Sequence, residues 1–249
     1  MTAVAWVAGD PIDVSAVDLR ETGLRAGPVG PSLPREHTSE GRQLRRWLVQ
    51  VLVAERVVAS VPGVDEADAP ALAEIAPDRA ALLGLGSVAA DLLSRSALAR
   101  AVFVAVTAEV VVGPEAVALF YERNLERFRV PEERLVTHTL GGTSTRRALR
   151  RGQLAGAVED AVFAAAEGEV VGPVHDPLGT HTVVIEEVRP ARVRPLAEVR
   201  AEIAGQLLAG ARRRAFTAWL DRQAATQVWL APGFEHPGDP GQPDNTHRH

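Results

Sequence analysis

The chain contains neither cysteine nor lysine. The absence of cysteine excludes disulfide bonds, thiolate metal sites and thiol nucleophiles. The absence of lysine excludes Schiff-base chemistry and a P-loop, whose lysine contacts the nucleotide phosphates. All 27 basic residues are therefore arginines.

Long apolar runs and an excess of positive charge are also missing. No stretch approaches the roughly 18 apolar residues that suggest a membrane span, and the first residues lack the basic and apolar regions of a secretory signal. We therefore predict a cytoplasmic protein with no membrane partner. The formal net charge is -5. Nucleic acid is not an expected partner, because the protein surfaces that bind it are usually basic.

Common catalytic motifs are absent as well. The sequence has no G-x-S-x-G elbow, no H-E-x-x-H pair and no G-x-G-x-x-G after a predicted strand. We predict no cofactor and no resident metal. With 249 residues, of which 46% are apolar, the chain is long enough for one sizeable core or two small ones.

Apolar spacing predicts a mixture of helices and strands. We expect one helix near residue 71–95 to be interrupted by proline and glycine, and the 98–112 segment to turn from helix to strand. The arginine-rich segment 145–151 is predicted to be a solvated helix or loop. The other expected strands are 3–7, 134–140 and 227–231, and the other expected helices are 13–24, 41–60 with Ser39 as N-cap, one opening at Pro114, and 196–225.

The most informative stretch runs from Gly152 to Val188. An amphipathic helix leads into a Gly-Glu turn, a short strand that ends in Pro-Val, a turn at Pro177 and Gly179, and a strand that opens with His181. This order resembles the closing half of a parvulin-type peptidyl-prolyl isomerase domain. The most specific part is the run from Glu159 to His181, with EDAVF, GEVVGPV and LGTH.

The wider order of elements resembles the SurA- and PrsA-like chaperone-isomerases, which build a substrate-holding domain around an inserted parvulin domain. The resemblance implies an α+β fold. Residues 1–130 and 190–231 would form a mainly helical chaperone-like domain, in which the first strand pairs with 227–231. A reduced parvulin module would occupy 132–189, and 232–249 would be a flexible tail.

Two histidines carry the expected site. Parvulins have one histidine in the first strand and another in the last, and the matches here are His138 in RLVTHTL and His181 in LGTHTVVI. Side chains alternate along a strand, so His138 shares a face with Val136 and Leu140. We therefore predict a buried or half-buried histidine pair joined by a hydrogen bond.

The resemblance also implies an apolar pocket for the proline ring. The corresponding positions are Leu154, Val158 and Leu178, none of them aromatic. The segment between the first strand and the helix is much shorter than in parvulins, since only residues 141–151 separate them. The acidic or cysteine residue expected beside the histidines has no evident match in the sequence.

The resemblance implies a peptidyl-prolyl isomerase or chaperone acting on unfolded or proline-containing polypeptide, with activity weakened or lost by the shortening. One alternative is a non-enzymatic protein that binds polypeptide or one dedicated partner. Another is a metal-responsive protein acting through the histidines and aspartates of the tail, since imidazole and carboxylate groups bind divalent metals. Those tail residues are His236, Asp239, Asp244, His247 and His249.

Overall fold

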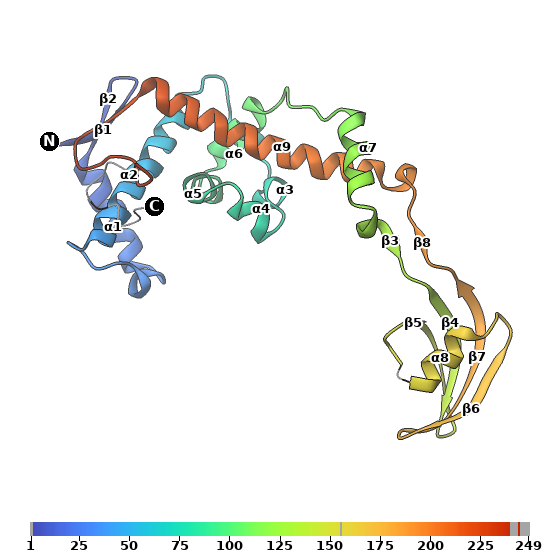
Figure 1. The fold of residues 1–249 in the computed structure, drawn as a ribbon. Coiled ribbons are helices and arrows are strands. Elements are labelled where there is room, and N and C mark those ends of the chain that lie inside the picture. Colours follow the sequence, from blue (N-terminus) through green and yellow to red (C-terminus); the bar gives the residue numbers. More distant parts are fainter. Residues whose placement is uncertain (1, 155, 240–243, 245–249) are drawn as a thin grey trace. The chain divides into compact units, whose positions relative to one another are not determined.

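The computed structural model describes residues 2–154, 156–239 and 244. Contacts within the chain divide it into two compact units (Figure 1). The helical unit comprises Met1–Val112 and Gln206–His249, and the sheet unit comprises Gly113–Gly205. The predicted parvulin module, 132–189, lies inside the sheet unit, which also takes in the segments on either side of it.

A three-stranded antiparallel sheet closes one end of the helical unit. Its order is β2-β1-β9, and the bounds are β1 (Ala3–Val7), β2 (Asp10–Asp13) and β9 (Val228–Leu230). Trp6 of β1 lies opposite Trp229 of β9, with ring centroids 4.5 Å apart. The predicted pairing of the first strand with the last one is confirmed, so both ends of the chain contribute to this unit.

Two capped helices follow the first strands. Helix α1 (Val14–Ala26) starts after Asp13, whose carboxylate accepts a hydrogen bond from the backbone N–H of Ser15. Helix α2 (Ser39–Ala59) is capped by Thr38 rather than by the predicted Ser39, since the Thr38 hydroxyl accepts from the N–H of Gly41. Such side-chain caps satisfy N–H groups that have no partner within the helix.

Proline and glycine divide the next segment into short helices, as predicted. The prediction for 98–112 is wrong in its second half, because the helix ends at Val106 and residues 107–112 form no strand. The elements after α2 are η2 (Glu66–Asp68), α3 (Leu72–Ile75), α4 (Arg79–Leu83), α5 (Ser87–Arg95) and α6 (Ala97–Val106). A further short helix, η1 (Gly30–Ser32), lies between α1 and α2.

Helix α2 contributes to both apolar clusters of the helical unit. One cluster joins α2 to α5, α6 and Phe216 of α9 (Leu196–Gln227), and the other joins α2 to α1, β1 and β2. The division between the two units falls inside α9, whose residues from Gln206 onward belong to the helical unit. In the part of the chain that the structure describes, no helix is both long enough and apolar enough to span a bilayer.

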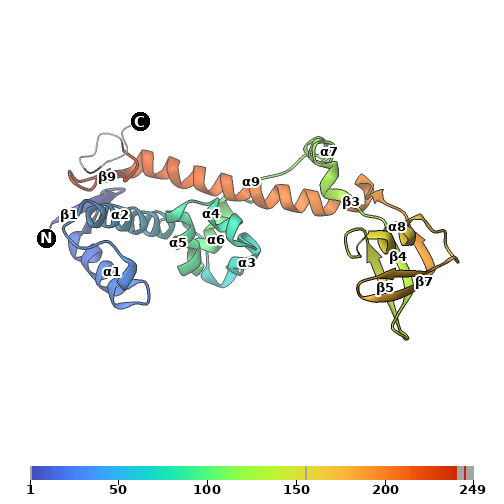
Figure 2. The same cartoon turned by 60° about the horizontal axis from the view of Figure 1, so that its bottom comes forward.

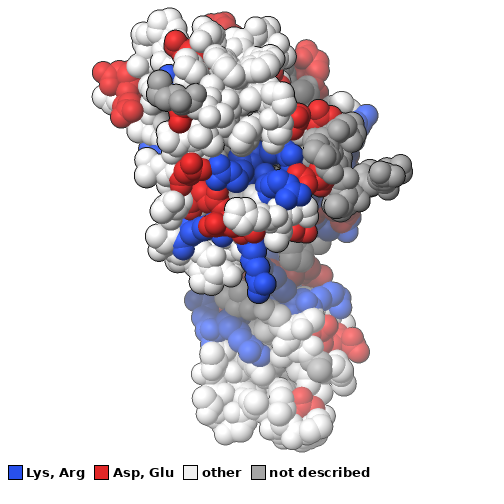
Figure 3. Space-filling model, turned by 90° about the vertical axis from the view of Figure 1, so that its left-hand side faces the viewer, with Lys and Arg blue, Asp and Glu red and all other residues white. Residues whose placement is uncertain are grey.

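Arginines on α1 and α2 are paired with carboxylates. Arg20 contacts Glu55 at 2.7 Å, and Glu21 accepts from both Arg25 and Arg45. Figure 3 shows blue and red side chains interleaved over the middle of this face. This face is therefore of mixed sign and does not offer the basic stripe that nucleic acid requires.

The sheet unit is built on a four-stranded antiparallel sheet. Its order is β5-β4-β7-β6, with bounds β4 (Glu133–Leu140), β5 (Thr143–Arg150), β6 (Val170–Asp176) and β7 (Gly179–Arg189). Helix α8 (Gly156–Ala164) lies against it (Figures 1 and 2). The other elements are α7 (Pro114–Arg123), η3 (Leu125–Phe128), β3 (Arg129–Val130) and β8 (Arg192–Val193).

The strand β5 corrects the prediction of a solvated helix or loop at 145–151. Gly141 and Gly142 both have positive φ, at 56° and 83°, as the two central residues of a type I′ hairpin turn require. The turn joins β4 directly to β5, and Leu140 pairs with Thr143. A hairpin therefore replaces the longer segment that parvulins have after their first strand.

Helix α8 packs its apolar side onto one face of the sheet. Val158, Val162 and Phe163 join inward-facing sheet residues in a single cluster. The guanidinium of Arg134, also on this face, donates to the backbone carbonyls of Val162, Phe163 and Ala165 at the end of the helix. A buried arginine thus satisfies carbonyls that the helix itself leaves without partners.

Candidate functional site

The two histidines lie side by side on the inward face of the sheet. Leu140 of β4 pairs with His181 of β7, and His138 pairs with Val183, so the two imidazoles are diagonal neighbours across adjacent strands. His138 is 8% exposed and His181 is 3% exposed. Nε2 of His138 lies 2.8 Å from Nδ1 of His181, which is the hydrogen-bonded pair expected from strand alternation.

Two further residues extend this pair into a chain of four. Nη2 of Arg147 on β5 lies 2.9 Å from Nδ1 of His138. Nε2 of His181 lies 2.8 Å from Oδ1 of Asp176, at the end of β6. We call these four residues, Arg147, His138, His181 and Asp176, the relay.

The chemistry of the end groups fixes the direction of every hydrogen bond in the relay. A guanidinium can only donate, so Nδ1 of His138 accepts and its Nε2 carries the proton. That N–H donates to Nδ1 of His181, whose Nε2–H then donates to the carboxylate of Asp176. Both imidazoles are therefore neutral, and all four ring nitrogens are used.

The surroundings of the relay favour these protonation states. Burial lowers the pKa of His138, and the positive charge of Arg147 lowers it further. Burial opposes ionisation of Asp176, but hydrogen bonds from His181 and from the backbone N–H of Leu178 outweigh it, and the pKa of Asp176 falls below its usual range. The relay thus holds neutral imidazoles beside an ionised carboxylate.

A glycine lets β6 approach β7 beside the relay. Gly172 has φ of 118°, and a Cβ placed there would lie 2.5 Å from the backbone oxygen of His181. The register between the strands shifts at this point, between Val171 and Val174. The irregularity is followed directly by the segment that ends in Asp176, so it helps to bring the carboxylate to His181.

The three predicted pocket residues lie in different surroundings. Val158 is 2% exposed within the core beneath α8, so it offers no surface to a ligand. Leu154 is half-buried against the same core. Leu178 is 77% exposed on the β6–β7 turn, where its backbone N–H donates to Asp176 at 2.7 Å.

The arginine cluster of β5 is engaged within the sheet unit. Arg146 pairs with Glu186 and Arg150 with Glu133, while Arg147 belongs to the relay. The guanidinium of Arg151 lies 4.6 Å from the ring centroid of Phe163. The cluster is therefore part of the sheet's own polar contacts.

The tail was the third candidate site. Phe234 packs against the second apolar cluster of the helical unit, and Asp244 pairs with Arg42 and with Arg46, the latter at 2.7 Å. Residues 240–243 and 245–249 of the predicted flexible tail, which include His247 and His249, lie outside the described residues. Among the described residues, no group of three or more histidines and carboxylates could hold a metal ion.

Sequence reasoning missed Asp176 and Arg147. The prediction that no acidic residue stands beside the histidines is wrong, because Asp176, at the end of β6, accepts a hydrogen bond from His181. Asp176 precedes Pro177 and accepts from the N–H of Gly179 at 3.2 Å, which is typical of an aspartate that initiates a turn. Its place five residues before His181 was the available signal.

A family model confirms the predicted resemblance for part of the chain. Residues 138–201 match the PPIC-type PPIase domain, the parvulin type of peptidyl-prolyl isomerase. The matched region begins at His138 and includes His181 and Asp176. Residues 3–40 match a family of unknown function, DUF7158. No curated protein matches the sequence.

Solved structures of chaperones are also similar to this chain. Two are from the study of the virulence factor PEB4 and the periplasmic protein Cj1289, SurA-like chaperones of Campylobacter jejuni. The first has 11% identity and a TM-score of 0.43, covering 93% of this chain and 100% of the other. The second has 15% identity and a TM-score of 0.42, covering 90% and 96%.

The peptidylprolyl isomerase PrsA from Bacillus cereus is similar at 14% identity and a TM-score of 0.24, covering 79% of this chain and 88% of that one. All these TM-scores are below 0.5, and the resemblance of the sheet unit to the PPIC-type PPIase domain rests on the family model.

The predicted cytoplasmic location is contradicted by these comparisons, since Cj1289 is described as a periplasmic protein. The prediction relied on the absence of a signal-like segment, and such an absence does not establish a compartment.

Proposed function

We propose that the sheet unit binds proline-containing polypeptide and accelerates the cis–trans isomerisation of X-Pro bonds. The observation that carries the proposal is the directed relay, which ends on a carboxylate beside an exposed leucine. The side chain of Asp176 is 24% exposed, so the relay ends at a group that a ligand can reach. The match to the PPIC-type domain over 138–201 supports the same reaction.

The reaction needs no nucleophile and no cofactor. Its barrier of about 18–20 kcal/mol comes from amide resonance, which places negative charge on the carbonyl oxygen and shortens the C–N bond. A carboxylate held near that oxygen disfavours the charge-separated form. The twisted transition state carries less charge on the oxygen, so the carboxylate destabilises it less than the planar ground state and the barrier falls.

Each residue then has a distinct part. Asp176 faces the amide, and Leu178 and the exposed side of Leu154 contact the proline ring. His181 and His138 are positioning residues, because their ring nitrogens are all occupied and they act by holding Asp176 ionised and oriented. Val158 belongs to the core on which Leu154 packs.

The test is an NMR exchange measurement on short X-Pro peptides, with the residue before proline varied. The variant Asp176→Asn keeps the shape but removes the charge, and we expect it to lose at least about tenfold of the acceleration. Asp160→Asn is the matched control, since Asp160 is exposed on α8. Equal rates for the two variants would contradict the role of Asp176.

A second candidate is polypeptide holding without catalysis. It is favoured by the burial of both histidines and by the full use of their ring nitrogens, which leaves neither imidazole free to contact a substrate. The same preparations decide between the two functions. A wild-type protein that isomerises no peptide but suppresses aggregation of an unfolded client would be a holding chaperone.

A further inference from the structure

The relay crosses the whole sheet and carries opposite charges at its two ends. Arg147 lies on β5 and Asp176 on β6, which are the two edge strands of the order β5-β4-β7-β6. Their backbones are three strand spacings, about 14 Å, apart. The guanidinium and the carboxylate are somewhat closer, because both side chains reach inward along the relay. Three residues of extended polypeptide, about 10 Å, span a similar distance.

The positive end of the relay has no counter-charge. Two neighbours on β5 are paired, Arg146 with Glu186 at 2.6 Å and Arg150 with Glu133 at 3.1 Å. Arg147 has no carboxylate partner among the described residues, and its one hydrogen bond there is to Nδ1 of His138. A guanidinium has five N–H donors in a planar fork that fits a carboxylate. Arg147 is exposed, so most of its donors are available to a ligand.

The negative end is already satisfied within the chain. Asp176 accepts from Nε2 of His181 and from the backbone N–H groups of Leu178 and Gly179. These three donors offset its charge, so a basic group of a ligand gains less at Asp176 than an acidic group gains at Arg147. An acidic group placed directly beside Asp176 would be repelled. The two ends together therefore favour a ligand whose carboxylate lies at a distance from its X-Pro amide.

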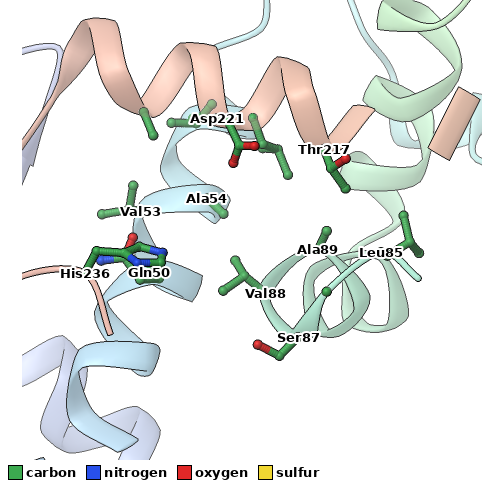
Figure 4. Close-up of a pocket in the computed structure, with 14 residues that line it drawn as sticks. Gln50, Val53, Ala54, Leu85, Ser87, Val88, Ala89, Thr217, Asp221 and His236 are labelled. Carbon is green, nitrogen blue, oxygen red and sulfur yellow. The ribbon is translucent and has the colours of Figure 1, made fainter. Parts of the chain in front are cut away.

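A cavity in the helical unit offers a donor of a different kind. It has a volume of ≈ 280 Å³ and lies between α2, α5 and α9 (Figure 4), with an apolar wall that includes Val53 and Leu220. Nε2 of Gln50, which also lines it, is buried and has no hydrogen-bond partner among the described residues. Asp221 and His236 line the same cavity, so it combines an acidic group with one that can become positive. It selects no charge, unlike Arg147.

We infer that the sheet unit selects proline-containing polypeptide with an acidic residue two or three positions from the proline, and that Arg147 is the residue that reads this charge. The guanidinium binds the acidic side chain while the X-Pro amide lies at Asp176. The inference rests on the proposed function and names its substrate class. Arg147 acts here on the ligand directly, in addition to its hydrogen bond to His138.

The test compares glutamate with glutamine in short X-Pro peptides, acetylated and amidated, at each of the three positions on either side of the proline. NMR exchange gives kcat/KM for each peptide. We expect glutamate to be favoured about tenfold at the best position, the lower end for a hydrogen bond to a charged group. That position should be two or three residues from the proline, and glutamate next to it should bring no gain.

The variant Arg147→Gln removes the charge but keeps an N–H donor for His138, so the direction of the relay is preserved. We expect its ratio of kcat/KM for glutamate over glutamine to fall to about one. Arg146→Gln is the matched control, since it removes the same charge from the next residue of β5, which is paired with Glu186. Its ratio should equal that of the wild type.

Three outcomes would overturn the inference. They are a wild-type ratio near one at every position, a ratio that survives Arg147→Gln, and a largest ratio next to the proline. An equal loss in Arg146→Gln would also overturn it, because the preference would then come from the net charge of the sheet unit.

A binding measurement separates failure of the inference from failure of the proposed function. The ring signals of His138 report binding, since its Nδ1 accepts from the same guanidinium. If the wild type isomerises no peptide but binds the glutamate peptide about tenfold more tightly, and Arg147→Gln abolishes the difference, the isomerase function fails and the inference stands. If Asp176→Asn loses isomerisation while glutamate and glutamine peptides behave alike, the inference alone fails.

Discussion

The relay of the sheet unit contrasts with one buried amide of the helical unit. In the sheet unit, Arg147, His138, His181 and Asp176 form one chain in which each donor has an acceptor. In the helical unit, the buried Nε2 of Gln50 has no partner among the described residues. Buried polar groups are usually paired. A ligand with a hydrogen-bond acceptor would therefore supply the partner that Nε2 of Gln50 lacks.

The two arrangements suit different tasks: the relay orients a side chain, and the cavity in the helical unit can bind a ligand. A saturated chain resists rearrangement, because changing one member leaves its neighbours without partners. The relay is therefore suited to holding Asp176 in one position and one charge state. The cavity between α2, α5 and α9 has an apolar wall and an unpaired hydrogen-bond donor, which suits a ligand that binds reversibly. The predictions below test each half of this contrast.

The largest effect is expected from Phe216→Ala in the helical unit. Phe216 is fully buried, with its ring centroid 5.3 Å from that of Phe103 and 5.8 Å from that of Trp219. Truncation should lower the free energy of unfolding by about 3–5 kcal/mol, measured by urea denaturation with tryptophan fluorescence. All four tryptophans lie in the helical unit, so the signal reports on that unit alone.

The control is Phe216→Leu, which keeps much of the volume and should cost about 1 kcal/mol. The histidine ring signals of the relay should be unchanged in both variants. A loss below about 1 kcal/mol for Phe216→Ala would show that the apolar cluster around it does not stabilise the unit.

The next effect is expected from Gly172→Ala in the sheet unit. The added Cβ would meet the backbone oxygen of His181, and φ at this position is unfavourable for alanine. We expect a loss of about 3 kcal/mol, the upper end for strained backbone, measured by hydrogen exchange of β6 and β7 amides. Gly168→Ala is the control, since Gly168 also has positive φ but open space at its Cβ position. Equal losses would show that the close approach of the strands contributes nothing.

Breaking the relay should cost less. His181→Leu removes the acceptor for Nε2 of His138 and the donor to Asp176, and we expect a loss of about 2 kcal/mol, since buried polar groups are left unpaired. The double variant His138→Leu/His181→Leu should lose about 1 kcal/mol less than the sum of the single variants. Hydrogen exchange of β4 and β7 amides measures all three. Additive losses would show that the imidazoles do not act as a connected pair.

The sequence was sufficient for the parts of the fold that depend on apolar periodicity. It predicted the long helices, the pairing of the first and last strands and the common face of His138 and His181, because a period of two fixes which side chains share a face. The clearest failure was β5. Its run TSTRRALR has few apolar residues because it is an edge strand with mostly exposed side chains, and only the Gly141–Gly142 turn indicated a hairpin.

Only two of the four relay residues were predicted from the sequence, and the reason is related. His138 and His181 stand in recognisable strand motifs, whereas Arg147 and Asp176 are brought to them by strand pairing and by the irregularity at Gly172. Such contacts depend on register, and register is set by turns and bulges more than by the identity of the residues that meet. The cavity in the helical unit had no sequence signal, since its lining comes from four separate segments.

The smallest effect is the pH dependence of the relay. Burial and Arg147 keep the pKa of His138 below its ordinary value of about 6.5 in the folded state. Below that pH the unfolded chain binds a proton that the folded chain does not, so stability falls as pH decreases through about 6.5 and is constant above it. An NMR titration of the His138 ring signal, with hydrogen exchange at each pH, measures both quantities. His138→Leu should flatten the dependence. An unaltered slope in that variant would place the titrating group elsewhere and would remove the neutral imidazole on which the direction of the relay depends.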